Sequence, residues 1–256
     1  MKHLVAGKGF IGTALGERLE GEVKYLDRSS GDIKQDITRE FNLEEKFDTV
    51  YNTVGLAPGF ATEKQYRKVH VEGTRNLLNA VNTEKFVQVS ALRCEVDHPF
   101  FNTKKEAEQL VKDSGLEHTV IRPSTVIGRG NKLLELMKKA SITRVFPRTP
   151  AKMQPVTVEN LVDCLVKVQD TRNGETLNIA GPEKMTVTEM AEKIYREEGR
   201  NCTLLPIPPE FFEDMLKTLG TVNRPPLTKQ NWKLIKADNT TDTNHAPQLT
   251  QLEKAF

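Results

Sequence analysis

Short apolar runs alternate with longer amphipathic stretches over residues 1–181. Apolar runs of this length, bounded by polar residues and glycines, predict buried strands. They lie at residues 2–6, 22–27, 48–54, 85–90, 118–122 and 176–180. The amphipathic stretches predict helices, and the longest spans residues 63–81. Because strands and helices alternate, the pattern predicts an α/β fold: a Rossmann-type, doubly wound parallel sheet.

Less regular stretches lie between these elements. Further expected elements are a short extended stretch at 32–36, helices at 103–114 and 159–168, and a strand at 154–158. The charged run between Asp36 and Lys46 also has a helix-like pattern.

The composition shifts after residue 181, where prolines become more frequent and helices look isolated. Helices are expected at 188–198 and 211–219. We therefore expect two domains, a Rossmann core at residues 1–181 and a small lobe for substrate or partner at residues 182–256. In folds of this kind ligands bind at the carboxyl edge of the sheet, which such a lobe would cover.

A glycine-rich loop follows the first predicted strand. Gly7, Lys8, Gly9, Phe10, Ile11 and Gly12 form a GxGxxG sequence between a strand and a helix, and Asp27 ends the next strand. This is the context that a dinucleotide-binding fingerprint requires. The first glycine allows a tight turn, the second lets the backbone approach a pyrophosphate, and the third lets the helix pack closely.

Composition and charge narrow the classes of partner. The 256 residues carry a net charge of +2, which predicts neither a nucleic-acid footprint nor a basic membrane-binding patch. No apolar run approaches the roughly 18 residues that a membrane span needs. The three cysteines, Cys94, Cys164 and Cys202, have no metal-ligand spacing, so no metal site is expected.

The same features bear on the cellular compartment. An odd number of widely spaced cysteines favours a reducing compartment. The chain shows no leader sequence before its first predicted strand. The expected location is therefore the cytoplasm or another reducing compartment, or the mitochondrial matrix side if a presequence has been removed.

Seven segments in order along the chain carry a family resemblance. They are 5–12 (VAGKGFIG), 35–38 (QDIT), 71–78 (VEGTRNLL), 86–90 (FVQVS), 103–108 (TKKEAE), 121–124 (IRPS) and 177–182 (LNIAGP). Together they resemble the extended and atypical short-chain dehydrogenase/reductase superfamily, which includes nucleotide-sugar epimerases and dehydratases. The usual family loop is GxxGxxG, and here Ala6 stands at its first glycine.

The resemblance implies roles for individual residues. Asp36 and Ile37 would flank the adenine, and Lys104 would bind the ribose on the nicotinamide side. The remaining implied contacts of the dinucleotide are Val54, Gly55, Leu56, Ser90 and Pro123. For Val54 and Leu56, ordinary packing at a strand end is an equally good interpretation.

The form of the cofactor stays open between NAD and NADP. Asp27 lies where an acid accepts hydrogen bonds from the ribose 2′-hydroxyl, which favours NAD. Arg28 and Lys8 are basic residues at places that in this superfamily go with NADP, since an arginine can bind a phosphate through two parallel bonds. They could equally be solvated surface cations.

The catalytic residues depart from the family. Its redox chemistry uses a YxxxK pair, in which the tyrosine exchanges a proton with the substrate. Here Phe100 stands four residues before Lys104, and none of the four tyrosines is followed by lysine at that spacing. Where the family has a Ser-Ser or Ser-Thr pair, this chain has Ser90-Ala91, so the second, catalytic hydroxyl is missing. His70 stands where the family has asparagine.

Other groups could supply an acid or base. Lys104 itself is the candidate catalytic residue, as in some atypical reductases of the superfamily. Cys94, Glu95, Asp97 and His98 lie in the loop before it, and we expect them to be exposed polar loop residues. We expect His3, His118 and His245 to be structural or surface residues, because their spacing does not suggest a zinc site.

Two functions follow from these patterns. The first is an NAD(P)-binding protein with a structural or regulatory role, similar to the dehydrogenase-like accessory subunit of respiratory complex I, whose tail resembles residues 227–239. The second is an oxidoreductase or epimerase-like enzyme that uses Lys104 or a nearby loop residue. The expected partners are a dinucleotide and either a small-molecule substrate or a larger protein complex. Residues 182–226 would shape the pocket for such a substrate. A homodimer formed through core helices is also possible in this family.

Overall fold

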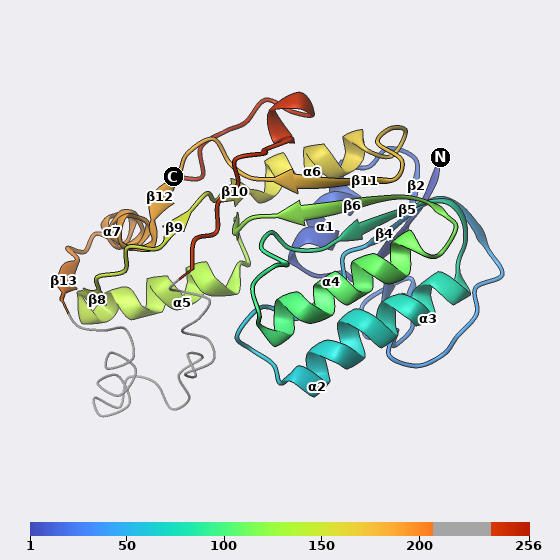
Figure 1. Ribbon diagram of the computed structural model, residues 1–256, viewed down its shortest axis with the longest axis horizontal. Helices are drawn as coiled ribbons and strands as arrows, with labels where there is room; N and C mark the ends of the chain where they lie inside the picture. Colours follow the sequence, from blue (N-terminus) through green and yellow to red (C-terminus); the bar gives the residue numbers. More distant parts are fainter. Residues whose placement is uncertain (207–236) are drawn as a thin grey trace.

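A seven-stranded, all-parallel sheet forms the centre of the molecule (Figure 1). The structure is a computed structural model that describes residues 1–206 and 237–256. The strand order is β11-β6-β5-β4-β1-β2-β3. Their bounds are β1 Lys2–Ala6, β2 Glu22–Asp27, β3 Ile33–Lys34, β4 Lys46–Asn52, β5 Asn82–Val89, β6 Glu117–Pro123 and β11 Glu175–Ile179. The doubly wound sheet predicted from the sequence is confirmed.

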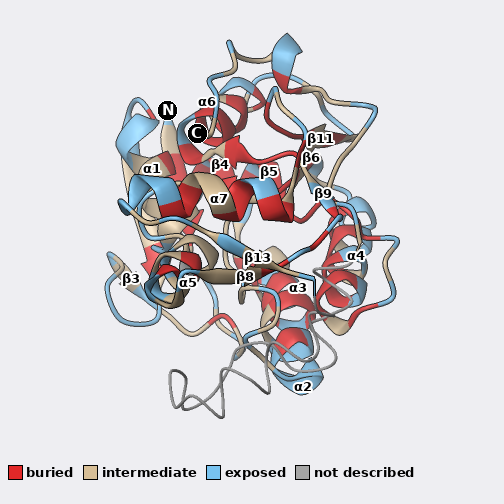
Figure 2. Ribbon diagram, turned by 90° about the vertical axis from the view of Figure 1, so that its left-hand side faces the viewer, coloured by how far each residue is buried: buried red, intermediate tan, exposed pale blue. Residues whose placement is uncertain are grey.

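Helices cover both faces of the sheet, and the alternation of side chains along β1 shows why. Val5 belongs to a core cluster with α1 (Phe10–Arg18) and α6 (Val158–Lys167), whereas Leu4 faces the opposite layer. That layer contains α2 (Glu63–Tyr66), η1 (Arg67–Glu72), α3 (Gly73–Ala80) and α4 (Pro99–Lys112). Because successive strand residues point to opposite faces, a fully apolar strand such as β1 must be covered on both sides. The buried residues in Figure 2 accordingly gather where helices meet the sheet.

The predicted helix at 63–81 is interrupted. Residues 67–72 form a π-helical turn, η1, between α2 and α3. A π-turn inserts one extra residue into the helix and so rotates the side chains that follow. This brings His70 and Val71 into the buried interior.

A smaller group of elements lies beside the carboxyl edge of the sheet (Figure 1). Its members are β7 Val126–Ile127, α5 Lys132–Ala140, η2 Ser141–Thr143, β8 Val145–Pro147, β9 Lys152–Met153, β10 Val156–Thr157, β12 Met185–Thr186, α7 Val187–Glu197 and β13 Thr203–Leu205. Residues from α5 and α7 share one apolar cluster, which includes Met137 and Ile194. The division at residue 181 stays a prediction, and the expected helix at 211–219 and the tail at 227–236 lie outside the described residues.

One expectation about local structure is wrong, and two further elements have other bounds than expected. The charged run between Asp36 and Lys46 is not helical, because the Asp36 carboxylate accepts the Thr38 N–H in a turn. Phe41 and Leu43, two residues apart, then reach the same core cluster, which an extended chain allows and a helix does not. The strand expected at 154–158 shortens to Val156–Thr157, and the helix expected at 103–114 begins earlier, at Pro99.

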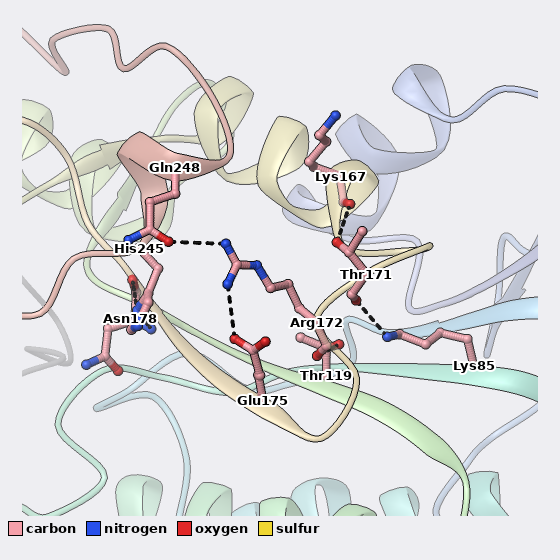
Figure 3. Close-up of polar contacts among 9 residues, drawn as sticks. All are labelled: Lys85, Thr119, Lys167, Thr171, Arg172, Glu175, Asn178, His245 and Gln248. Atoms are coloured by element: carbon pink, nitrogen blue, oxygen red, sulfur yellow. Dashed lines mark hydrogen bonds and ion pairs between the residues drawn. The ribbon is translucent and has the colours of Figure 1, made fainter.

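The final described segment returns to the edge strand β11 (Figure 3). The Asn178 N–H donates to His245 Nδ1 at 3.1 Å, and the Arg172 guanidinium donates to Gln248 Oε1 at 3.2 Å. Between them, η3 (Ala246–Gln248) places Ala246 in the main core cluster. Residues 244–253 therefore pack against the Rossmann core, whereas Asn239 pairs with Met153 of β9 and Phe256 joins the apolar cluster of α5 and α7.

Candidate functional site

The three glycines of the first loop differ in what surrounds them. Gly7 has a φ of +95°, and its N–H donates to Leu26 O at 2.8 Å. A Cβ on Gly12 would lie 1.9 Å from Gly7 O, so only glycine lets α1 approach the strand this closely. A Cβ on Gly9 would meet nothing within 4 Å. The backbone at the start of α1 is thus open beside Gly9 and tightly packed beside Gly12.

Thr53 supports this loop from the end of β4. Its hydroxyl is within 2.9 Å of both Ala6 O and Gly7 O. Gly9 is the N-cap of α1 and supplies no side-chain hydrogen bond to the helix. Such an uncapped N-terminus leaves backbone N–H groups and the positive end of the helix dipole for an anion.

Asp27 ends β2 in a tight turn. Its Oδ1 accepts hydrogen bonds from the backbone and the hydroxyl groups of Ser29 and Ser30, at 2.9 to 3.2 Å. These hydrogen bonds, that of the Ser29 N–H foremost, lower the pKa of Asp27 to about 2. Asp27 is therefore ionised at neutral pH.

Two basic residues lie near this turn. Lys8 Nζ donates to Ser30 O at 3.2 Å and lies 4.7 Å from the centre of the Tyr25 ring, so the glycine loop and the turn after β2 are joined. Arg28 is exposed, and its charge adds to the groups that lower the pKa of Asp36, after the Thr38 hydrogen bonds. The largest contribution to the lowered pKa of Asp36 is the hydrogen bond from the Thr38 N–H.

Ile37 is packed into the core rather than left open. Its Cδ1 would lie 2.7 Å from a Cβ added to Gly73 of α3, and the residue is buried in the cluster with Leu77. Its carbonyl accepts a hydrogen bond from Asn76 at 2.9 Å. Ile37 therefore fixes the loop after β3 against α3.

The segment after β4 covers the candidate lysine. A Cβ on Gly55 would lie 3.1 Å from Lys104 Nζ and 3.6 Å from His70 Nε2. Lys104 Nζ donates to Val89 O at 3.0 Å, and the residue is 6% exposed. Burial lowers the pKa of Lys104 to about 8, although the nearby Cys94 and Glu108 favour its charged form.

The Ser90 hydroxyl is hydrogen-bonded to a buried carboxylate. Its hydroxyl donates to Glu108 Oε1 at 2.5 Å, and Cys94 Sγ lies 3.6 Å away. Glu108 also binds Arg122 through two hydrogen bonds of 2.8 and 2.6 Å. Burial opposes ionisation of Glu108, yet the hydrogen bonds from Arg122 and Ser90 hold its pKa below the usual value.

Phe100 lies in an aromatic cluster. Its ring meets those of Tyr66, His70 and Phe101 edge-on, with centroids 5.6, 5.5 and 5.0 Å away. Edge-to-face pairs at these distances are favourable, and each contributes about 1 kcal/mol. The position four residues before Lys104 is therefore filled by packing and offers no exchangeable proton.

The loop before α4 is only partly as expected. Glu95 and Asp97 are exposed, but Cys94 and His98 are buried, so the expectation of four exposed residues is wrong for those two. The buried His98 is the N-cap of α4, and its Nδ1 accepts the Phe100 N–H. Burial raises the pKa of the Cys94 thiol to about 11, which makes it a poor nucleophile.

The remaining histidines form no metal site. His3 is buried in β1, while His118 and His245 contact backbone atoms nearby. Within residues 1–206 and 237–256 no group of three or more metal-ligating side chains comes together. In the same residues, no helix is both long enough and apolar enough to span a membrane.

The predicted site residues gather along one edge. Most of them lie at or after the carboxyl ends of β1, β2, β3, β4 and β5, whereas Lys104 lies in α4 and Pro123 ends β6, where its carbonyl accepts the Leu92 N–H at 2.8 Å. The ion pair of Glu108 and Arg122 was missed. The sequence contained a signal for it, because Glu108 lies on the buried face of α4 with Ala107 and Val111, where a carboxylate requires a partner.

Comparison with known proteins gives relatives by sequence and neighbours among solved structures. No family model matches the chain. The chain is 26% identical over 246 residues to the mitochondrial NADH-ubiquinone oxidoreductase 40 kDa subunit of Neurospora crassa, covering 89% of this chain and 63% of that protein. It is 30% identical over 120 residues to the mitochondrial NADH dehydrogenase 1 alpha subcomplex subunit 9 of Arabidopsis thaliana, covering 43% of this chain and 30% of that protein. This chain thus spans less than two thirds of the length of either subunit.

The chain is thus similar in sequence to subunits named for NADH-ubiquinone oxidoreductase and NADH dehydrogenase. Solved structures show where its fold recurs. The UDP-glucose 4-epimerase of Thermotoga maritima, with UDP-glucose, aligns with a TM-score of 0.68 at 18% identity, covering 92% of this chain and 97% of that one. MoeE5 in complex with UDP-glucuronic acid and NAD aligns with a TM-score of 0.68 at 21% identity, covering 80% and 85%. The fold is therefore that of the epimerases and reductases that the motifs resemble.

Proposed function

We propose that this chain binds NAD or NADP at the carboxyl edge of its sheet and has a structural or regulatory role, without ordinary dehydrogenase chemistry. The observation that carries the proposal is the packing of Phe100. The resemblance puts the proton-exchanging tyrosine there, and the ring is enclosed by Tyr66, His70 and Phe101.

Dinucleotide binding is supported by the start of α1. The backbone beside Gly9 is open, and the first turn of the helix has no capping side chain. A pyrophosphate bound there would accept these N–H groups. A structural relative, MoeE5, was solved with NAD.

Lys104 and Asp27 would contact the two ribose units. Lys104 Nζ lies beneath Gly55 and can donate to a hydroxyl that approaches the segment after β4. Asp27 is ionised and would accept hydrogen bonds from a 2′-hydroxyl, while Lys8, close to the same turn, would favour a 2′-phosphate. Titration with NADH and with NADPH decides between these two forms.

A structural role is supported by the hydroxyl group after β5, which is already hydrogen-bonded within the protein. Ser90 donates to Glu108, and Ala91 carries no hydroxyl. Neither residue is then available to orient a substrate oxygen. A dinucleotide bound without turnover would still stabilise the fold by RT ln(1 + [L]/Kd).

The relatives support a place in a larger assembly. Those from Neurospora crassa and Arabidopsis thaliana are named as mitochondrial subunits of NADH-ubiquinone oxidoreductase and NADH dehydrogenase. By analogy this chain would be an accessory subunit of such a complex, in a mitochondrial compartment. A homodimer through core helices is the alternative assembly.

A second candidate function rests on Lys104. Because burial lowers the pKa of its amine to about 8, Lys104 is partly neutral near physiological pH and could act as a base. The chain would then be an oxidoreductase or an epimerase-like enzyme, in which the nicotinamide accepts or donates hydride.

Turnover distinguishes the two functions. The wild type and Lys104→Met are each loaded with NADH or NADPH and given a panel of carbonyl compounds, and the absorbance of the reduced nicotinamide is followed. The structural role predicts binding with no oxidation above the buffer control in either protein. Oxidation by the wild type that disappears in Lys104→Met contradicts it.

A further inference from the structure

His70 is held at the junction of three elements. It lies in the π-turn η1, is 2% exposed, and stacks at 5.4 Å on Tyr66. π-turns of this kind occur often at functional sites, because the extra residue redirects a side chain. Here the redirected ring reaches both the segment after β4 and helix α4.

The hydrogen bonds of the ring fix its tautomer. The Leu56 N–H donates to His70 Nε2 at 3.1 Å, so Nε2 must carry the lone pair. The proton is then on Nδ1, which donates to Thr103 Oγ1 at 2.9 Å. Thr103 can in turn donate to Pro99 O at 2.8 Å. Every proton in this chain of bonds has an acceptor.

The ring stays neutral because of its surroundings. Burial, and then the charge of Lys104, lower the pKa of His70 to about 2. The Tyr66 and Phe100 rings face it from α2 and α4, and Lys104 is the charged group acting on it. The bond from Leu56 therefore persists across physiological pH.

This bond ties the segment after β4 to the π-turn η1. Gly55 precedes Leu56 and covers both Lys104 Nζ and His70 Nε2. Without an acceptor at His70, the part-buried Leu56 N–H would need another partner, and Gly55 would move with it. Gly55 is thus held from both sides, by the Val54 N–H that donates to Asn52 Oδ1 at 3.2 Å and by the Leu56 N–H that donates to the ring nitrogen of His70.

We infer that His70 is a positioning residue: its Nε2 atom holds residues 54–56 over the Lys104 amine and so sets the affinity of the site for a dinucleotide. This inference rests on the proposed function. His70 would touch neither ribose nor nicotinamide and would act only through Leu56 and Gly55.

Two amide substitutions separate the two ring nitrogens. A glutamine side chain reaches about as far as Nε2 and can accept the Leu56 N–H, whereas asparagine reaches only about as far as Nδ1. We expect His70→Gln to bind NADH or NADPH within about threefold of the wild type, and His70→Asn to bind about tenfold more weakly. Dissociation constants are measured from the fluorescence of the reduced nicotinamide, and circular dichroism with thermal melting verifies that both variants fold.

Thr103→Val is the matched control, since it removes the partner of Nδ1 and leaves Nε2 intact. We expect its affinity to stay within about threefold of the wild type, because the loss of one neutral hydrogen bond elsewhere does not move Leu56. Equal weakening in His70→Gln and His70→Asn, or no weakening in either, overturns the positioning role.

A spectroscopic measurement on the wild type tests the bridge itself. Long-range nitrogen–proton NMR correlations of labelled histidine should show a neutral His70 ring protonated on Nδ1, the minor tautomer of free histidine. A ring protonated on Nε2 overturns the inference without any variant. If the wild type binds neither NADH nor NADPH, the proposed function fails, and that failure is distinct from a wild type that binds while the two variants behave alike.

Discussion

The carboxyl edge of this sheet has two halves that are built differently. Near β1 and β2 the site consists of backbone groups, with Gly9 open and the first turn of α1 uncapped. Near β5 and β6 it consists of side chains that already bind one another, as Ser90, Glu108 and Arg122 do. A site made of backbone depends on glycine and helix geometry, whereas a site made of side chains changes its chemistry with a single substitution.

The largest effect is expected from the packed glycine. Gly12→Ala would put a methyl group 1.9 Å from Gly7 O, and we expect a loss of more than about 3 kcal/mol in the free energy of unfolding. Dinucleotide binding should be lost with it. Chemical denaturation measures the first effect and nicotinamide fluorescence the second.

Gly9→Ala is the matched control in the same loop. Its Cβ meets nothing within 4 Å, so the free energy of unfolding should change by less than about 0.5 kcal/mol. Binding should nevertheless weaken, because the methyl group would occupy the open space beside the α1 N-terminus. Undiminished binding in Gly9→Ala would mean that the ligand does not approach the backbone there.

The buried lysine gives the next effect and a dependence on pH. The pKa of Lys104 is lowered from 10.5 to about 8, so between those values the unfolded chain binds a proton that the folded chain does not. The stability of the wild type should therefore rise with pH through this window. Lys104→Met should be more stable than the wild type by up to about 3 kcal/mol near neutral pH, and this difference should vanish above the upper value.

Denaturation curves at a series of pH values measure this effect. A stability of Lys104→Met below that of the wild type at neutral pH would show that the hydrogen bond to Val89 O outweighs the cost of burying the amine. The same variant should bind the dinucleotide more weakly at every pH.

The ion pair of Glu108 and Arg122 is expected to contribute somewhat less to the free energy of unfolding. Glu108→Gln should lower the free energy of unfolding by about 2 kcal/mol, because it removes the charge that Arg122 and Ser90 contact. Since the pKa of Glu108 is held below its usual value, this contribution is present above the unfolded-state pKa and is lost as pH falls through the folded-state pKa.

Glu106→Gln on the same helix is the control for Glu108→Gln. Glu106 pairs with Arg67 at the surface, and its loss should cost less than about 0.5 kcal/mol. Equal costs for the two variants would show that the Glu108 network is no more important than a surface pair.

The smallest effect on stability is expected at the aromatic cluster. Phe100→Tyr adds a hydroxyl among Tyr66, His70 and Phe101 and should cost about 1 kcal/mol. No turnover should appear, because Ala91 still lacks a hydroxyl and Ser90 is bound to Glu108. Turnover in Phe100→Tyr would show instead that the missing tyrosine alone keeps the wild type inactive.

Much of the fold could be predicted because its signals are local. The strands at 2–6 and 22–27 were predicted with their observed bounds, since apolar runs between polar residues have few alternatives. The charged run after Asp36 was not, because its turn depends on one carboxylate that bonds to Thr38. The π-turn at His70 also left no signal in the periodicity of 63–81.

The candidate site divides in the same way. Sequence spacing could indicate the glycine loop, because glycine itself is the requirement. It could not show that His98 caps α4 or that Ser90 donates to Glu108, since both depend on contacts formed only in the folded chain. The roles of the individual dinucleotide contacts stay predictions.

Whether the chain carries a dinucleotide can be measured by mass spectrometry of the small molecules released when the native protein is denatured. We expect about one equivalent of NAD, NADP or a reduced form for each chain, and its loss in Gly12→Ala. Release of no dinucleotide, by a protein that also takes up none when NADH and NADPH are added, would contradict this expectation.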